Sequence, residues 1–217
     1  MFRQLEQMES RQLIERRSSG GAEAVYRLSA QGRLVALGGY DPVVEWGRRW
    51  DGRWRLVLFD LPQTKASARA KLRRFLQSSR FGYLQNSVWI SPDPLDSISR
   101  ELSATAADVE SLITMEARPA AGESDADIVA GAWNFQRINR GYERCLEVLA
   151  QLPTAKPRDP SSAEELLRWA RLEKRTWQNA VDADPLLPTS LLPAEYLGTQ
   201  AWKERIRVLA KAGQLIQ

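Results

Sequence analysis

Residues 50–62 are Trp-Asp-Gly-Arg-Trp-Arg-Leu-Val-Leu-Phe-Asp-Leu-Pro, and this stretch decides the fold of the middle of the chain. Its apolar part, residues 54–59, is nearly continuous, as in a central strand of a sheet, and Pro62 ends it. Two helices and three further strands follow. We expect the helices at residues 66–79 and 95–103, and the strands at residues 82–86, 87–90 and 112–117. The resulting order, βαββαβ, predicts a ferredoxin-like domain over residues 46–120.

The first of these helices has one apolar and one basic side. The side chains expected to point into the core are Ala70, Leu72, Phe75 and Leu76. Those expected to point outward are Lys65, Arg69, Arg73 and Arg74.

The first 40 residues have the order of the rear half of a winged helix. Phe2, Leu5 and Met8 recur at helical spacing, and two short strands, 13–17 and 24–29, then flank a turn at 18–21. A second helix is expected to start at 29–33. In winged-helix proteins the helix before the hairpin is the recognition helix, which enters the major groove, and the hairpin contacts phosphates. The candidate DNA-binding residues are therefore Arg3, Gln4, Gln7 and Arg11 on the helix and Arg16, Arg17 and Arg27 on the hairpin.

A complete winged helix needs about two more helices before the recognition helix, to bury its apolar face. Residues 1–45 are therefore interpreted as a partial winged-helix element. Three explanations stay open: a start codon assigned too far downstream, a fragment trimmed at its beginning, or a lineage that has lost full DNA binding. In a fourth interpretation, residues 1–40 are a helix and hairpin that only pack on the next domain.

Residues 121–217 are expected to form an all-α domain, which makes the fold class α+β. One helix is predicted over about 126–151, and a second begins at the capping signal Ser161-Ser162-Ala163-Glu164. Residues 184–193 are Asp-Pro-Leu-Leu-Pro-Thr-Ser-Leu-Leu-Pro. Because each proline fixes its own φ and restricts the residue before it, this segment is expected to be a rigid brace that buries its leucines.

The composition excludes several kinds of active site. The chain has no histidine, so Ser-His-Asp and Cys-His catalysis and the usual zinc sites are excluded. Cys145 is the single cysteine, which fits a reducing compartment, and no apolar run reaches the roughly 18 residues of a membrane span. The expected location is the cytoplasm. A formal charge of +4 permits nucleic-acid binding.

The stretches 50–62 and 184–193 together resemble the phenylacetate-catabolism repressors, the PaaX-like regulators, over nearly the whole chain. Residues 132–142 are similar to the family's Ala-Trp-Asp-Leu helix, with Asn134 in place of the aspartate. The family's His-Glu-x-Arg set corresponds to residues 172–175, where leucine replaces the histidine. The resemblance implies a homodimeric repressor joined through its ferredoxin-like domain. It implies operator DNA as partner, phenylacetyl-CoA or another aryl- or acyl-CoA thioester as effector, and neither enzyme activity nor a cofactor.

A CoA thioester suits a cleft that combines aromatic faces with arginines, because it carries an adenine ring and several phosphates. Such a cleft is expected in the helical domain. The candidate effector-binding residues are Trp133, Arg137, Arg140, Glu173 and Arg175. Most of the eight tryptophans are interpreted as core anchors.

Two rival functions stay open. The ferredoxin-like part also resembles the small CRISPR-associated nuclease, in which an aspartate ends the first strand, and Asp60 is the matching position. A single carboxylate per subunit is a weak cation site that needs a second subunit and waters, so the primary expectation is no metal. The other rival is a regulator that lacks autonomous DNA binding.

Overall fold

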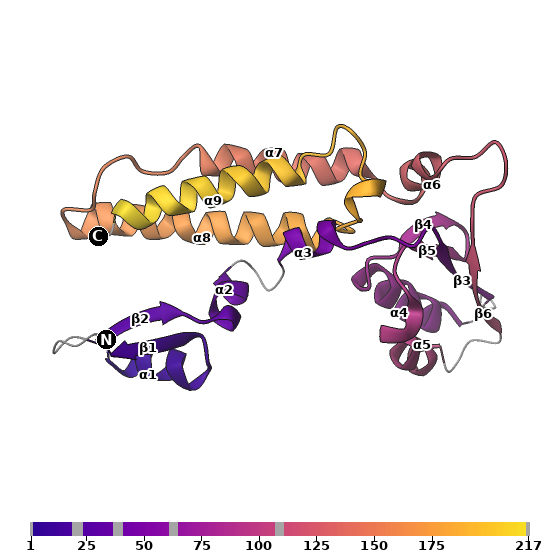
Figure 1. The fold of residues 1–217 in the computed structure, drawn as a ribbon, viewed down its shortest axis with the longest axis horizontal. Coiled ribbons are helices and arrows are strands. Elements are labelled where there is room, and N and C mark those ends of the chain that lie inside the picture. The colour runs from indigo at the N-terminus through magenta and orange to yellow at the C-terminus, as the bar shows by residue number, and fades with distance from the viewer. Residues whose placement is uncertain (1, 19–23, 37–40, 61–64, 107–110, 216–217) are drawn as a thin grey trace. The chain divides into compact units, whose positions relative to one another are not determined.

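The computed structural model describes residues 2–18, 24–36, 41–60, 65–106 and 111–215 (Figure 1). The chain divides into two compact units, residues 1–44 and 45–217. Helices and antiparallel strands are both present, so the predicted α+β class is confirmed. Among the described residues, no helix is long and apolar enough to cross a membrane.

The first unit contains a helix, a hairpin and a second helix, in the predicted order. These elements are α1 (Phe2–Ser10), β1 (Ile14–Ser18), β2 (Ala24–Leu28) and α2 (Ala30–Ala36). The predicted turn at 18–21 lies, from residue 19 onward, outside the described residues. Ser29 joins the hairpin to α2, since its hydroxyl donates to the Gln12 carbonyl and accepts the Gly32 N–H at 2.8 Å. A Cβ at Gly32 would lie 1.8 Å from the Leu13 carbonyl oxygen, so only glycine permits this approach.

The central part of the second unit has the predicted βαββαβ order. After α3 (Pro42–Gly47), its elements are β3 (Trp54–Asp60), α4 (Ala66–Ser78), β4 (Gly82–Gln85), β5 (Val88–Ser91), η2 (Leu95–Ser97), α5 (Ser99–Thr105) and β6 (Ser111–Ala117). The strands form one antiparallel sheet in the order β4-β5-β3-β6, which is the ferredoxin-like topology. The helix predicted at 95–103 is instead a short 3₁₀ turn followed by α5.

The two faces of β3 enter different hydrophobic cores. Val57 and Phe59 pack with Leu72 and Leu76 of α4, whereas Trp54 belongs to the core of the helical domain. This follows from the alternation of side chains along a strand. The prediction that Ala70 points inward is wrong, because it lies on the exposed side of α4.

The helical part corrects one prediction, because the single helix expected at 126–151 is two helices. The elements are α6 (Asp125–Ala132), α7 (Phe135–Leu149), α8 (Pro160–Ala183), η3 (Thr189–Leu191) and α9 (Gly198–Leu215). Trp133 is extended, with φ −130° and ψ 139°, and the Asn134 side chain accepts the Arg137 N–H at 2.9 Å. An asparagine in this position is a helix N-cap, so it starts α7 and ends the continuity with α6.

The start of α8 also lies earlier than predicted. Asp159 caps it by accepting the Ser162 N–H at 2.9 Å, and Pro160 occupies the first helical position. The capping signal is therefore Asp159-Pro160 together with Ser162, rather than Ser161 to Glu164.

Candidate functional site

Most of the predicted DNA-binding residues are exposed within the first unit. Gln4 and Gln7 lie on α1, Arg11 directly follows the end of α1, and Arg16 and Arg27 lie on the hairpin. The hairpin register sets Arg27 opposite Glu15 and Arg16 opposite Tyr26. The side chains of Arg3 and Arg17 lie outside what the structure describes.

The brace at 184–193 begins with a buried carboxylate. Asp184 is 1% exposed, and the hydroxyls of Tyr142 and Tyr196 both donate to its Oδ2, while the Leu186 N–H donates to Oδ1 at 2.8 Å. Trp46 extends the network, because its Nε1–H donates to the Tyr196 hydroxyl at 3.1 Å. Burial raises the pKa of Asp184 and also the pKa values of the two tyrosines.

Two arginines tie this brace to the ferredoxin-like part. Arg80, which follows α4, donates to the carbonyl oxygens of Val181 and Asp184. Arg48 donates to the Leu186 carbonyl and forms a bidentate pair with Asp93, at 2.7 and 2.8 Å. Buried carbonyl groups at the end of a helix and in the segment after it need hydrogen-bond donors. The two arginines supply these donors and so fix the brace where the sheet meets the helices.

Glu173 is occupied inside the helical domain. It is 5% exposed, and Arg205 of α9, 1% exposed, donates from Nε to its Oε1 at 2.6 Å. The guanidinium carbon of Arg205 also lies 4.8 Å from the centroid of the Trp177 ring. The structure therefore places the predicted effector residue Glu173 away from the exposed Arg175, two positions along the chain.

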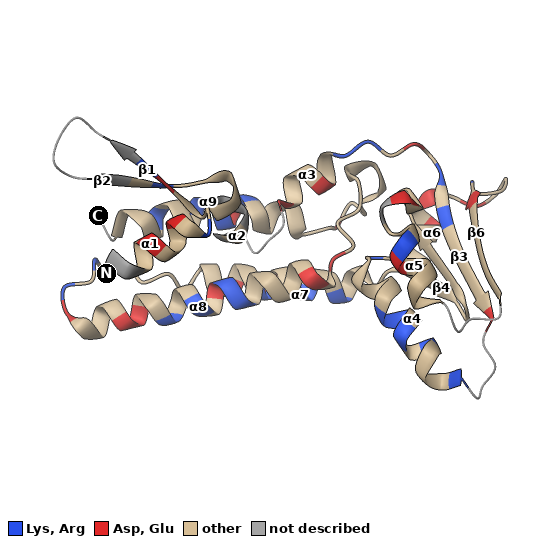
Figure 2. Cartoon of the chain, turned by 90° about the horizontal axis from the view of Figure 1, so that it is seen from below, with Lys and Arg blue, Asp and Glu red and all other residues tan. Residues whose placement is uncertain are grey.

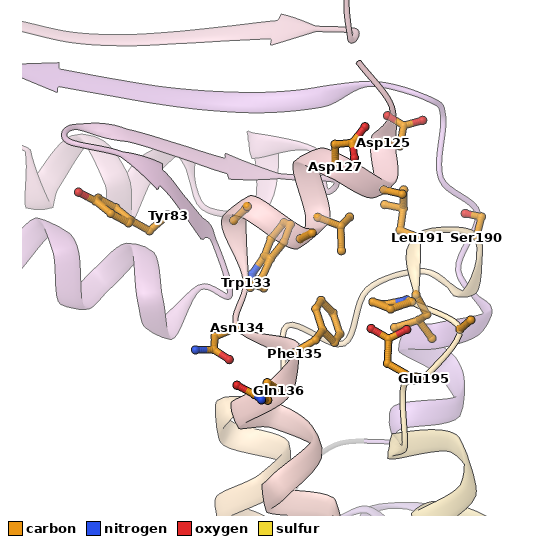
Figure 3. A pocket seen from close by; sticks show the side chains of 18 residues that line it. Tyr83, Asp125, Asp127, Trp133, Asn134, Phe135, Gln136, Ser190, Leu191 and Glu195 are labelled. Carbon is orange, nitrogen blue, oxygen red and sulfur yellow. The ribbon is translucent and has the colours of Figure 1, made fainter. Parts of the chain in front are cut away.

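One pocket of the second unit has an acidic lining. It has a volume of about 920 Å³ and lies between α6, the α6–α7 junction and the segment after η3. Figure 3 shows Asp125 and Asp127 at one end and Glu195 on the opposite wall, with Trp133 and Phe135 between them. None of the described residues that line it is a lysine or an arginine. A ligand that carries several phosphates would meet like charge there.

Two smaller pockets share Arg137 but differ in charge. The first is also lined by Asp182 and the buried Asp184, whereas the described lining of the second has arginines and no acidic residue. The first, about 370 Å³, lies where the sheet meets the helices and includes Trp133 and Arg80; the second, about 450 Å³, runs between α7 and α8 and includes Arg144 and Arg175. Of the predicted effector set, Arg137 lines both pockets, Trp133 lines only the first and Arg175 only the second. Arg140 is exposed and lines neither pocket.

Asp60 ends β3 and is exposed, opposite Ser111 of β6. Within the described ranges, no three Cys, Asp or Glu side chains gather as metal ligands. A metal site shared between two subunits through Asp60 stays a hypothesis.

Comparison with known families identifies the two parts of the second unit. Residues 47–129 match the PaaX protein central Cas2-like domain, and residues 133–212 match the PaaX-like protein C-terminal domain. The chain belongs to the PaaX-like family. Among solved structures, it is similar to the uncharacterized protein Rv0674 from Mycobacterium tuberculosis, with 24% identity and a TM-score of 0.57 over 99% of this chain and 81% of that one. This likeness shows a shared fold. No curated protein matches the chain.

Sequence reasoning missed the residues that organise this PaaX-like fold at the brace. No sequence pattern identified Tyr142 as a buried hydrogen-bond donor, and none pointed to Tyr196, Arg48, Arg80 or Arg205. An Asp-Pro pair that follows a long helix is a usable signal, because the aspartate ends the helix and its carboxylate then needs buried donors. The identity of those donors follows only from the tertiary structure.

Proposed function

We propose that this PaaX-like protein is a DNA-binding transcriptional repressor whose DNA affinity is lowered by an aryl- or acyl-CoA thioester. The observation that carries the DNA-binding part is the first unit. Its exposed residues include Gln4 and Gln7 of α1, Arg11 directly after α1, and Arg16 and Arg27 of the β1–β2 hairpin. Arginines on a hairpin suit phosphate contacts, and glutamines on a helix suit base edges.

The distribution of charge favours one effector site over the other. The pocket lined by Arg137, Arg144 and Arg175 has no acidic residue in its described lining, whereas the larger pocket has Asp125, Asp127 and Glu195. The adjoining pocket adds the Trp133 ring and Arg80, together with Asp182 and the buried Asp184. Because CoA carries several phosphate charges, we assign the thioester to the pockets around Arg137 and Arg175.

The homodimer is proposed to form through the sheet. β6 is an edge strand, and its Ile113 and Met115 are 50% and 44% exposed. Exposed apolar side chains beside an unpaired strand edge favour association with a second copy. Substitution of both residues with lysine is expected to give monomers in sedimentation velocity. A double variant that remains dimeric would move the interface elsewhere.

The central experiment is fluorescence anisotropy of a labelled duplex from the protein's own promoter region, titrated at several salt concentrations with and without phenylacetyl-CoA. We expect binding that exceeds binding to a scrambled duplex, with a log–log salt slope of about −0.9 per phosphate contact. The thioester is expected to weaken the complex. Arg16→Ala and Arg27→Ala should each weaken binding to both duplexes, since phosphate contacts carry no sequence information.

The effector assignment has its own pair of variants. Arg137→Gln should raise the thioester concentration needed for release, whereas Arg140→Gln, three residues away and outside both pockets, should not. Equal effects of the two variants would contradict the assigned site. Failure of the unmodified protein to bind either duplex would refute the proposed function.

A further inference from the structure

The α4 helix has a basic face that the proposed function does not use. This 13-residue helix contains Arg69, Lys71, Arg73 and Arg74 and no acidic residue. Figure 2 shows blue segments along α4 without a red one. Leu72 and Leu76 hold the opposite side of the helix in the core of the ferredoxin-like part.

Three of these cations have no acidic partner in the part of the chain that the structure describes. Lys71, Arg73 and Arg74 are exposed, and none forms an ion pair with another described residue. Arg73 donates to the Asn86 carbonyl at 3.4 Å and Arg74 to the Ala70 carbonyl at 3.3 Å, which leaves other guanidinium N–H groups available. Arg69 and Lys65 have interactions of their own and are not counted in this face.

The surface between these cations is small and polar. The other exposed residues of α4 are Ala66, Ser67, Ala70, Gln77 and Ser78. Small side chains let a ligand backbone approach the helix, and Gln77 adds a donor. The exposed arc offers no large apolar anchor, which a membrane surface or the centre of a protein interface would need.

We propose that the Lys71–Arg73–Arg74 face of α4 is a second DNA contact, which binds phosphates of the duplex outside the site contacted by the first unit. Lysine and arginine side chains that bind phosphates release counterions and carry no sequence information. The face therefore raises the affinity for DNA without recognising bases. This inference rests on the proposed function, because it requires that the protein binds DNA.

The test compares two triple variants of the full chain. One changes Lys71, Arg73 and Arg74 to glutamine. The matched control changes Arg168, Arg171 and Lys174, which are exposed on α8, so that the net charge falls equally. Both are titrated with the promoter duplex and the scrambled duplex at several salt concentrations, and thermal unfolding confirms that each is folded.

We expect the α4 variant to lose about 0.9 in the magnitude of the salt slope for each phosphate contact removed, or about 2.7 for all three. The loss should be the same on both duplexes, and the preference for the promoter duplex should be kept. The control slope should change by less than one contact.

An unchanged slope in the α4 variant, while the unmodified protein binds DNA, refutes this inference and leaves the proposed function intact. An equal loss in the control also refutes it, because the effect would then come from net charge. No binding by the unmodified protein refutes both.

Discussion

Arg205 and Glu173 form a buried ion pair between α9 and α8, with the Arg205 Nε 2.6 Å from the Glu173 Oε1. The pair packs against the aromatic ring of Trp177, whose centroid lies 4.8 Å from the guanidinium carbon of Arg205. Two charges that are withdrawn from water in this way depend on each other, since the loss of one leaves the other without compensation.

Glu173→Ala is therefore expected to lower the free energy of unfolding by about 3–5 kcal/mol, because it leaves the Arg205 guanidinium buried and unpaired. Urea denaturation measures this change. Arg175→Ala, at an exposed position two residues away, is the control and should change stability by less than about 0.5 kcal/mol. Similar values for the two variants would mean that the pair is not buried in solution.

The tyrosines that donate to Asp184 give a second prediction. Tyr196→Phe and Tyr142→Phe should each cost about 1–3 kcal/mol, because a buried carboxylate then loses a donor. The double variant should deviate from additivity, since both hydroxyls share one acceptor oxygen. Tyr83→Phe, on an exposed ring, should be neutral in the same denaturation experiment. Full additivity would argue against a shared acceptor.

Asn134 gives a third prediction, which concerns the break between α6 and α7. Asn134→Ala should destabilise the protein by about 1 kcal/mol through loss of the N-cap, whereas Asn134→Asp should be nearly neutral because aspartate caps equally well. Asn179→Ala, at an exposed position within α8, controls for loss of an amide. A large effect of the aspartate variant would show that the amide group has another role.

The pairing of Asp51 with Arg55 gives a fourth prediction, which concerns how the stability of the fold changes with pH. Its hydrogen bonds with the buried Arg55 lower the pKa of Asp51 to about 2. A carboxyl group whose folded pKa lies below its unfolded value stabilises the fold above the unfolded pKa, and this contribution is lost as the pH falls toward the folded pKa. Stability should therefore fall between about pH 4 and pH 2.

In Asp51→Asn, this fall should be shallower when urea midpoints are measured across that range. Asp96→Asn, which removes an exposed carboxylate elsewhere in the ferredoxin-like part, is the control and should retain the slope of the unmodified protein. If both variants lost stability with acid as the unmodified protein does, the pair between Asp51 and Arg55 would not contribute.

The ferredoxin-like order could be predicted from the sequence because its signals are local. The apolar run that ends at Pro62 and the amphipathic period of residues 66–79 each specify one element, and the order of the elements restricts the topology. The break at Trp133 could not be predicted by periodicity, because the apolar residues on either side continue the same stripe. Asn134 marks the break, yet an asparagine within a helical pattern is as compatible with a solvent-facing position.

The candidate site was less predictable than the fold. Side-chain chemistry suggested Trp133, Arg137 and Arg175 together, and the structure sets them along two adjoining pockets. The same chemistry suggested Glu173, whose partner Arg205 lies 32 positions later in the sequence. Long-range pairing of this kind depends on how α9 packs against α8, which no local pattern encodes.

Cys145 provides a built-in reporter of how the helical domain opens. It is the single thiol in the chain, it is 3% exposed on α7, and burial raises its pKa to about 12. Both properties suppress its reaction with alkylating reagents while the core is closed. Alkylation therefore requires the core to open. Where the core recloses faster than the thiol reacts, the labelling rate of the unmodified protein measures the opening equilibrium without any engineered probe.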